Sequence, residues 1–216
     1  MRLNPARFNR FLSKIGQDLA WRPSSACPCV QPYSGSPDPS CPHCAGKGRL
    51  WAAATACSAG IVSRDIMRQA APMAILDAGD VMLVIPSDQP IYGIGEYDRV
   101  VMTDRTEPFS LNLIAGTNAL RFNPVSIDRI TWLAGDGKLV DGTPPTGWAN
   151  GTLTWTTPKP PAKPPTTPPA GVTVAITGRR HPEYFCWLTL ALDRPHHSGE
   201  PLPRRVVLRR FDLFGA

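Results

Sequence analysis

The sequence predicts a mainly β protein, in which a β-barrel or sandwich domain follows an N-terminal helix and a small knuckle built on four cysteines. Apolar residues near the N-terminus recur at helical spacing, and four cysteines gather in residues 27–44. From residue 79 onward, short apolar or alternating runs are separated by Gly, Pro, Asn and Asp. We therefore expect a helix and knuckle in residues 1–60 and a β-barrel-like domain in residues 61–216, with a proline-rich insertion at 157–170.

An amphipathic helix is expected from about residue 5 to residue 18. Asn4 and Pro5 are typical of an N-cap followed by proline at the first helical position. The apolar residues that follow at helical spacing are Phe8, Phe11, Leu12, Ile15 and Leu19. This stripe either packs on the domain or docks the helix onto a neighbouring subunit, beside the basic residues Arg7, Arg10 and Lys14.

Two closely spaced cysteine pairs frame the knuckle: Cys27 and Cys29, then eleven residues, then Cys41 and Cys44. Two such pairs can converge on one tetrahedral ion, and four thiolates select a soft or borderline metal. We predict a closed, structural zinc site with the ligands Cys27, Cys29, Cys41 and Cys44. Because the first pair is spaced CxC rather than CxxC, disulfides and unpaired thiols stay open as alternatives.

Other residues of this stretch fit the same prediction. His43 lies between better placed ligands and is expected to face solvent. Gly46 and Gly48 allow turns with positive φ, which bring amide N–H groups close to the sulfurs. Residues 31–40 contain turn-forming residues and no apolar run, so the segment should depend on the metal for its structure. Outside the knuckle, Cys57 and Cys186 are predicted to be buried free thiols.

The predicted β domain begins where the pattern changes near residue 79. Strands are expected at 80–86, 99–103, 109–114, 120–122, 126–133, 151–156, 172–177, 183–192 and 204–214. Residues 50–74 are Ala-rich and poorly patterned, with one short helix suggested near 63–69.

The sequence also predicts which way some strands face and how two of them pair. In residues 126–133 the alternation puts Ile127, Arg129, Thr131 and Leu133 on one face and Asp128, Ile130 and Trp132 on the other. The strands at 172–177 and 183–192 are expected to pair with each other around residues 178–182. In the final strand, a bulge near Arg209 would return Phe211 and Leu213 to the face of Val206 and Leu208.

Residues 157–170 hold seven prolines in fourteen residues. Proline lacks a backbone donor, so this segment is expected to stay out of the sheets as extended polyproline II. A solvated surface loop is the simpler interpretation, and a docking arm for a partner is the alternative.

Charge is distributed unevenly along the chain. Residues 1–64 carry a net charge of +6, residues 65–178 carry −3, and residues 179–216 carry +3. This polarity suits nucleic acid, subunits that stack on acidic neighbours, or simply a solvated basic surface. No apolar run is long enough to span a bilayer and the N-terminus lacks a signal-peptide core, so we expect folding in a reducing cytoplasm.

Catalytic motifs are hard to find. Gly93 and Gly95 lack the strand–turn–helix context of a dinucleotide site, and there is no phosphate loop or nucleophile motif. His181, His196 and His197 lie near prolines in expected turns. We therefore expect a protein that is not an enzyme.

The ordered set of motifs resembles a family of small virion proteins of tailed bacteriophages. It comprises RFNRFL at 7–12, the CPC and CPHCAGKGR knuckle at 27–49, the IPSD-containing segment at 79–92, VSIDR at 125–129, RRHPEYF at 179–185 and LPRRVVLRRFDLFG at 202–215. The resemblance covers nearly the whole chain except the proline-rich insertion. It implies a head–tail connector or head-closure role, with a β-barrel subunit in a homo-oligomeric ring of six- or twelve-fold symmetry between the portal and the tail.

The leading hypothesis is therefore a non-enzymatic structural protein of the virion neck. Its partners would be the portal or adaptor ring and tail proteins, with non-specific contact to packaged DNA, and no membrane. The alternative is a zinc-containing nucleic-acid-binding protein, favoured by the pI of about 9.2 and by the knuckle but weakened because aromatic and basic residues are not interleaved in the knuckle. A redox or catalytic zinc protein would need an open coordination position that four cysteines deny.

Overall fold

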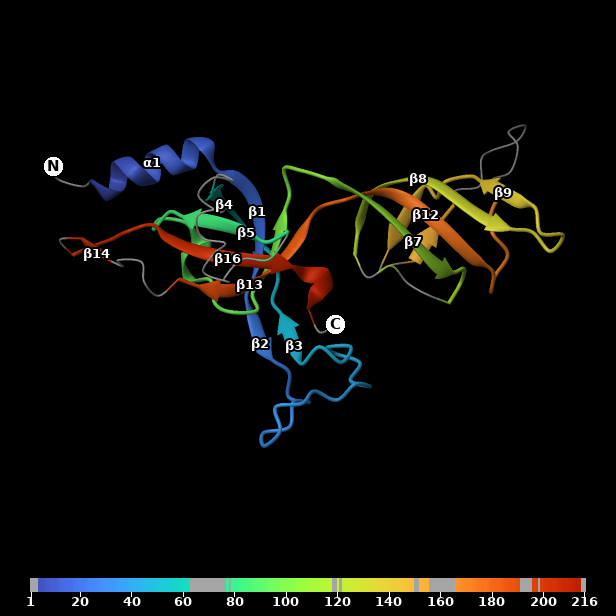
Figure 1. Ribbon diagram of the computed structural model, residues 1–216, viewed down its shortest axis with the longest axis horizontal. Coiled ribbons are helices and arrows are strands. Elements are labelled where there is room, and N and C mark those ends of the chain that lie inside the picture. The colour runs from blue at the N-terminus through green and yellow to red at the C-terminus, as the bar shows by residue number, and fades with distance from the viewer. Residues whose placement is uncertain are drawn as a thin grey trace. The chain divides into compact units, whose positions relative to one another are not determined.

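The computed structural model describes residues 4–62, 77, 79–117, 120, 122–149, 152–155, 166–190, 196–197 and 199–214. Within these ranges the fold is mainly β, with one N-terminal α-helix (Figure 1). It includes a closed six-stranded barrel and a cluster of four cysteines. The predicted fold class is confirmed.

The chain forms two compact units, Met1–Asp104 with Pro182–Ala216, and Arg105–His181. This division differs from the one expected from the sequence at residue 60. That residue lies inside a strand of the first unit, and the second unit is inserted between two strands of the barrel.

The first unit is built on an antiparallel barrel whose strand order is β1-β4-β5-β16-β13-β6, closed by pairing of β6 with β1. Its strands are β1 (Gln17–Arg22), β4 (Thr55–Ile61), β5 (Val81–Ile85), β6 (Arg99–Met102), β13 (Glu183–Thr189) and β16 (Arg204–Arg210). Closure leaves the barrel without a free edge strand. The last strand of the chain, β16, lies between β5 and β13 and is paired on both sides.

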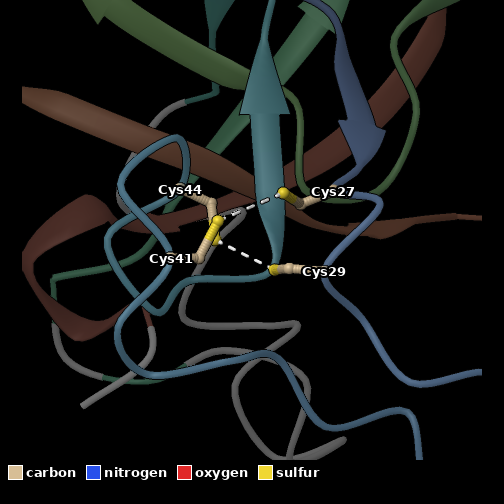
Figure 2. Close-up of side chains that lie close together, drawn as sticks. All are labelled: Cys27, Cys29, Cys41 and Cys44. Atoms are coloured by element: carbon tan, nitrogen blue, oxygen red, sulfur yellow. Dashed lines mark hydrogen bonds between the residues drawn. The ribbon is translucent and has the colours of Figure 1, made fainter.

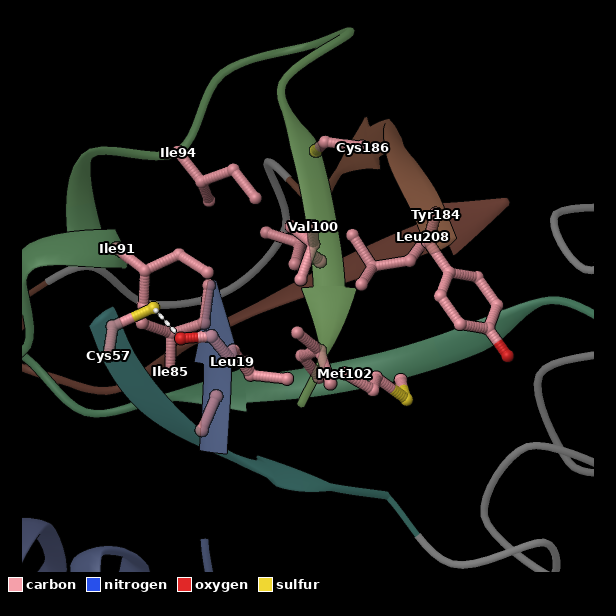
Figure 3. Close-up of a cluster of buried hydrophobic side chains, with 13 residues drawn as sticks. Leu19, Cys57, Ile85, Ile91, Ile94, Val100, Met102, Tyr184, Cys186 and Leu208 are labelled. Atoms are coloured by element: carbon pink, nitrogen blue, oxygen red, sulfur yellow. Dashed lines mark hydrogen bonds between the residues drawn. The ribbon is translucent and has the colours of Figure 1, made fainter. Parts of the chain in front are cut away.

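Side chains from every barrel strand meet in one apolar core (Figure 3). Leu19, Leu83, Ile85, Met102 and Leu208 are each at most 2% exposed. Burial of one such side chain contributes about 1.5–3 kcal/mol, so this core is the main stabilising element of the unit. Cys57 and Cys186 are buried free thiols of the same core, as predicted.

Helix α1 (Pro5–Ile15) is shorter than expected. Asn4 caps it as predicted, because its side chain accepts a hydrogen bond from the backbone N–H of Arg7 at 3.1 Å. At Gly16 the backbone becomes extended, and the following residues join the barrel as β1. Leu19, which fitted the helical stripe, is instead a core residue of that strand.

Strand β4 was not expected, because its sequence TACSAGI has no large alternating apolar residues. Its inward positions are the small side chains Cys57 and Ala59. At Gly60 an added Cβ would lie 3.1 Å from Cδ2 of Leu12, so the glycine lets α1 pack closely on the outer side of this strand.

The second unit contains a four-stranded antiparallel sheet of order β7-β12-β8-β9 and a two-stranded hairpin. The sheet strands are β7 (Glu107–Ile114), β8 (Pro124–Leu133), β9 (Leu139–Gly142) and β12 (Thr173–Arg180), and the hairpin consists of β10 (Gly147–Ala149) and β11 (Thr152–Thr154). A separate core holds this unit together, with Ile130, Val174 and Ile176 almost fully buried.

The alternation expected for β8 is wrong at Ile127. A register shift against β12 between Thr177 and Gly178 inserts one extra residue in β8, so Ile127 is buried together with Ile130 and Trp132. Gly178 makes this bulge possible, since a Cβ there would lie 2.1 Å from the Ser126 carbonyl oxygen.

Strands β12 and β13 do not pair with each other, contrary to expectation. β12 pairs with β7 and β8 in the second unit, whereas β13 pairs with β16 and β6 in the first. The bulge expected near Arg209 lies instead on β13, between Cys186 and Leu188. β16 ends at Arg210 and a 3-10 turn, η3 (Phe211–Leu213), follows it.

The remaining described elements of the first unit are short: β2 (Ser24–Ala26), β3 (Arg49–Trp51), η2 (Pro90–Gly93), β14 (His196–His197) and β15 (Glu200–Pro201). Leu120 and Phe122 are not in a strand. The helix suggested at 63–69 and most of the proline-rich insertion lie outside the described residues. No helix in the described ranges is long and apolar enough to cross a membrane.

Candidate metal centre

The knuckle is the long loop between β2 and β3, which pair antiparallel at its base. Cys27 directly follows β2, and its backbone N–H donates to the carbonyl of Gly48 at 2.9 Å. The other pair is held by a turn in which the N–H of Ala45 donates to the Cys41 carbonyl at 2.9 Å. Two strands thus hold the ends of the loop together, which brings the two cysteine pairs face to face.

The four sulfur atoms point toward one another in Figure 2, and all lie within 4.8 Å of each other. The Sγ atoms of Cys27 and Cys41 are 3.8 Å apart, and those of Cys29 and Cys44 are 3.5 Å apart. Sulfurs placed about 2.3 Å from a tetrahedral zinc ion lie about 3.8 Å from one another. The cluster therefore fits one ion with four thiolate ligands.

Disulfides do not account for this arrangement. Bonded sulfurs lie about 2.05 Å apart, and all four cysteines are free here. Cys27, Cys41 and Cys44 are buried and Cys29 is half-buried. In the knuckle, only Val30 and Leu50 add apolar packing to the cysteines. So small a core does not stabilise a loop of this length by itself.

The pKa values of two of the four thiols are shifted in opposite directions. Backbone hydrogen bonds from Cys44 and His43 lower the pKa of Cys41 to about 7. Burial raises the pKa of Cys29 to about 12. Zinc binds the thiolate form of cysteine, so a bound ion would have to keep the Cys29 thiol deprotonated.

The glycines after the second pair act as predicted. Gly46 and Gly48 have φ angles of 76° and 70°. The N–H of Gly48 points at the Cys44 sulfur, 3.3 Å away, where it would offset thiolate charge. His43 is exposed and lies outside the cluster, as expected.

The structure brings no other such cluster together among the described residues, where the cysteines are the one group of three or more metal-ligating side chains. Nδ1 of His181 lies 2.8 Å from the carbonyl oxygen of Arg105, a bond within the second unit. His196 and His197 form the short strand β14. Only His181 lies outside regular structure as expected, whereas His196 and His197 lie in a strand paired with β15 rather than in a turn.

The second unit also has a pocket of about 290 Å³, lined mostly by apolar side chains that include Leu113, Leu153, Trp155 and Val174. None of its lining residues carries a titratable side chain.

Sequence reasoning missed the surroundings of Lys47. Its Nζ donates a hydrogen bond to the carbonyl of Phe214 at 2.7 Å, across 167 residues of chain. Lys47 lay within the predicted knuckle, but no local pattern signals a contact at such a sequence separation.

Comparisons with known proteins leave the family open. A scan against protein-family models found no match to this chain, and a search of curated proteins found none either.

Proposed function

We propose that this chain is a structural, non-enzymatic subunit of the neck of a tailed-bacteriophage virion, where it joins or closes the head on the portal side to the tail. The observation that carries the proposal is the ordered series of motifs, which resembles small virion proteins of these phages from residue 7 to residue 215. The subunit would act within a homo-oligomeric ring of six- or twelve-fold symmetry, contact portal or adaptor and tail proteins, and assemble in the host cytoplasm.

The positions of the motifs in the fold support a structural role. The motif at 7–12 lies in α1, the one at 27–49 forms the knuckle, and those at 79–92 and 202–215 contain the paired strands β5 and β16. These four motifs build the helix, the knuckle and part of the barrel, while the motif at 125–129 lies in β8 of the second unit and the one at 179–185 runs from β12 into β13. A closed barrel with a clamped loop is a rigid body suited to a ring, whose subunits keep one shape while they bury surface on their neighbours.

Helix α1 is the surface that best fits a contact with a neighbouring subunit. Leu12 is buried against the barrel, while Phe8, Phe11 and Ile15 are 44%, 55% and 55% exposed. The helix also carries Arg7, Arg10 and Lys14 and no acidic residue. Asn9 fixes its orientation, because its Nδ2 donates to Ser87 Oγ at 2.8 Å. Apolar side chains beside cations suit a mixed interface with an acidic partner.

The basic last strand, the other contact suggested by the sequence, is a weaker candidate. β16 is hydrogen-bonded on both sides within the barrel, and Val206, Val207 and Leu208 are fully buried.

Zinc is the metal that we propose for Cys27, Cys29, Cys41 and Cys44. Four thiolates select zinc or an iron–sulfur centre, and the sulfur spacing fits a single tetrahedral ion. Four protein ligands leave no open position, so the ion would stabilise the knuckle without taking part in a reaction.

The alternative of a zinc-containing nucleic-acid-binding protein rests on the net charge of +6. However, the two basic side chains at the end of the knuckle, Lys47 and Arg49, make contacts within the protein. Lys47 donates to Phe214, and the Arg49 guanidinium lies 4.2 Å from the centre of the Tyr97 ring. This arrangement favours the neck proposal over nucleic-acid recognition by the knuckle.

The test is to mix the purified protein with portal-bearing heads assembled without it, and to image the portal vertex. Additional ring density at the vertex is the expected result, together with the protein's presence in purified virions. Absence of vertex binding combined with tight, salt-sensitive binding to free DNA would overturn the neck proposal in favour of the alternative.

A further inference from the structure

The C-terminal segment ends in a cluster of aromatic rings within the first unit. Phe214 is 9% exposed, and its ring centre lies 5.0 Å from that of Phe185, 5.7 Å from Trp51 and 5.8 Å from Tyr97. Phe211, on η3, stacks on Phe214 at 5.8 Å and meets Trp51 edge-on at 5.3 Å. Residues 211–214 are thus held by side chains rather than by strand pairing.

Many of the contacts that hold Phe211 and Phe214 come from residues 47–51, at the end of the knuckle and in β3. The Lys47 ammonium donates to the Phe214 carbonyl at 2.7 Å and lies 5.6 Å from the ring centres of both Phe211 and Phe214. Trp51, at the end of β3, contributes its ring and donates from Nε1 to the Tyr97 carbonyl at 3.1 Å. A cation close to two ring faces and a carbonyl oxygen gains from both contacts.

The position of Lys47 depends on the backbone turn formed by residues 44–48. The backbone N–H of Lys47 donates to the Cys44 carbonyl at 3.0 Å, and the next N–H, that of Gly48, points at the Cys44 sulfur. Gly46 and Gly48 hold positive φ angles on either side of Lys47. Displacing the Cys44 sulfur would therefore move the backbone from which Lys47 extends.

We propose that the cysteine knuckle, when it binds its metal ion, holds the C-terminal segment 211–214 in place through these contacts, and that loss of the ion releases this segment from the barrel. The knuckle lacks a core that would preserve the Cys44 turn without the ion. Release would expose Phe211 and Phe214 and free the end of β16, which continues directly into η3. The inference rests on metal binding by the four cysteines and is independent of the proposed place in a virion.

Hydrogen exchange of the full chain, read by mass spectrometry, tests this coupling. The protein is compared as purified with metal, after removal of metal by a chelator under reducing conditions, and after reloading with zinc chloride. We expect metal removal to speed exchange in peptides covering 209–214 at least tenfold, with little change in β5, and reloading to reverse it. A rise confined to residues 27–48, or an equal rise in β5, would overturn the proposal.

A variant that still binds metal separates the effect of the Lys47 contacts on segment 211–214 from the effect of the metal on the knuckle itself. Lys47→Met retains all four cysteines and should bind metal like the wild type, yet peptides covering 209–214 should exchange faster because the ammonium contacts are gone. Lys138→Met, an exposed change in the second unit, is the matched control and should have no effect. If the Lys47→Met protein, fully loaded with metal, exchanged at 209–214 like the wild type, Lys47 would not link the knuckle to the C-terminus.

Discussion

The carboxylate of Asp98 accepts a hydrogen bond from the indole Nε1 of Trp21 at 2.9 Å, across 77 residues of chain. The same carboxylate accepts from the backbone N–H groups of Ser24 at 2.7 Å and Gly95 at 2.9 Å. Asp98 is 5% exposed, so three donors converge on one buried anion. It ties the end of β1, where the chain leaves the barrel for the knuckle, to the turn before β6.

Replacing Asp98 with alanine should therefore destabilise the first unit. Three part-buried donors would lose their acceptor, and an unpaired donor costs up to about 1–3 kcal/mol when it is buried. We expect a loss of several kcal/mol in the free energy of unfolding, measured by urea titration. Asp88→Ala, at an exposed position, is the control and should change stability little. Equal stability of the two variants would mean that the Asp98 contacts contribute nothing to the fold.

Gly178→Ala should destabilise the second unit. The added Cβ would lie 2.1 Å from the Ser126 carbonyl oxygen and 2.9 Å from the Ile127 Cα, and both are backbone atoms that cannot move without breaking the bulge. We expect a loss of about 2 kcal/mol or more, as overpacking against backbone causes. In Gly135→Ala the new Cβ would meet nothing within 4 Å, so this variant should unfold like the wild type. Thermal unfolding of the two variants side by side distinguishes them.

One zinc ion per chain should be found by elemental analysis of protein purified without added metal. Cys41→Ser should lose most of this zinc and several kcal/mol of metal-linked stability, because three remaining thiolates bind the ion far less tightly. Cys57→Ala removes a cysteine outside the cluster and should keep one zinc per chain. Iron in place of zinc, or disulfides in a reduced preparation, would contradict the assignment.

Alkaline pH should weaken the barrel through its two core thiols. Burial raises the pKa of Cys57 to about 11 and that of Cys186 to about 12. An unfolded thiol ionises near pH 8.5, so their contribution is fully present below that pH and is lost as pH rises through 11–12. Urea unfolding from pH 7.5 to pH 10.5 should show the decline, and Cys186→Ala should make it shallower. An unchanged slope in that variant would exclude Cys186 as a cause.

Residues 157–165 should be dispensable for folding. The sequence predicts that all of 157–170 stays out of the sheets. In the structure, however, Thr166 exchanges two hydrogen bonds with Thr143, at 2.9 and 3.0 Å, and Pro168 and Ala170 line the pocket of the second unit. Replacing 157–165 with a short Gly/Ser turn should keep the melting temperature within a few degrees. Extending the replacement through 170 should lower it further, and a large loss from the shorter replacement alone would show that 157–165 supports the fold.

Local pattern was sufficient where a residue's role depends on its near neighbours in sequence. Asn4 and Pro5 mark the start of α1, the cysteine spacing and the glycines at 46 and 48 predict the knuckle, and alternating runs predict β5, β6, β7 and β12. Caps, tight turns and strand periodicity are set within a few residues, so the sequence by itself determined the mainly β class and the four cysteines of the candidate site.

Only the tertiary structure decided those features that depend on contacts between residues far apart in the sequence, namely which segments become strands, which strands pair and which side chains meet. β4 is a strand because it pairs with β1 and β5 in the barrel, and Ile127 changes faces because Gly178 admits a bulge. β12 and β13 are adjacent in sequence, yet each pairs within its own unit, where its apolar side chains find a core. The contact between Lys47 and Phe214 is of the same kind, since it exists only after the fold brings Phe214 next to the knuckle.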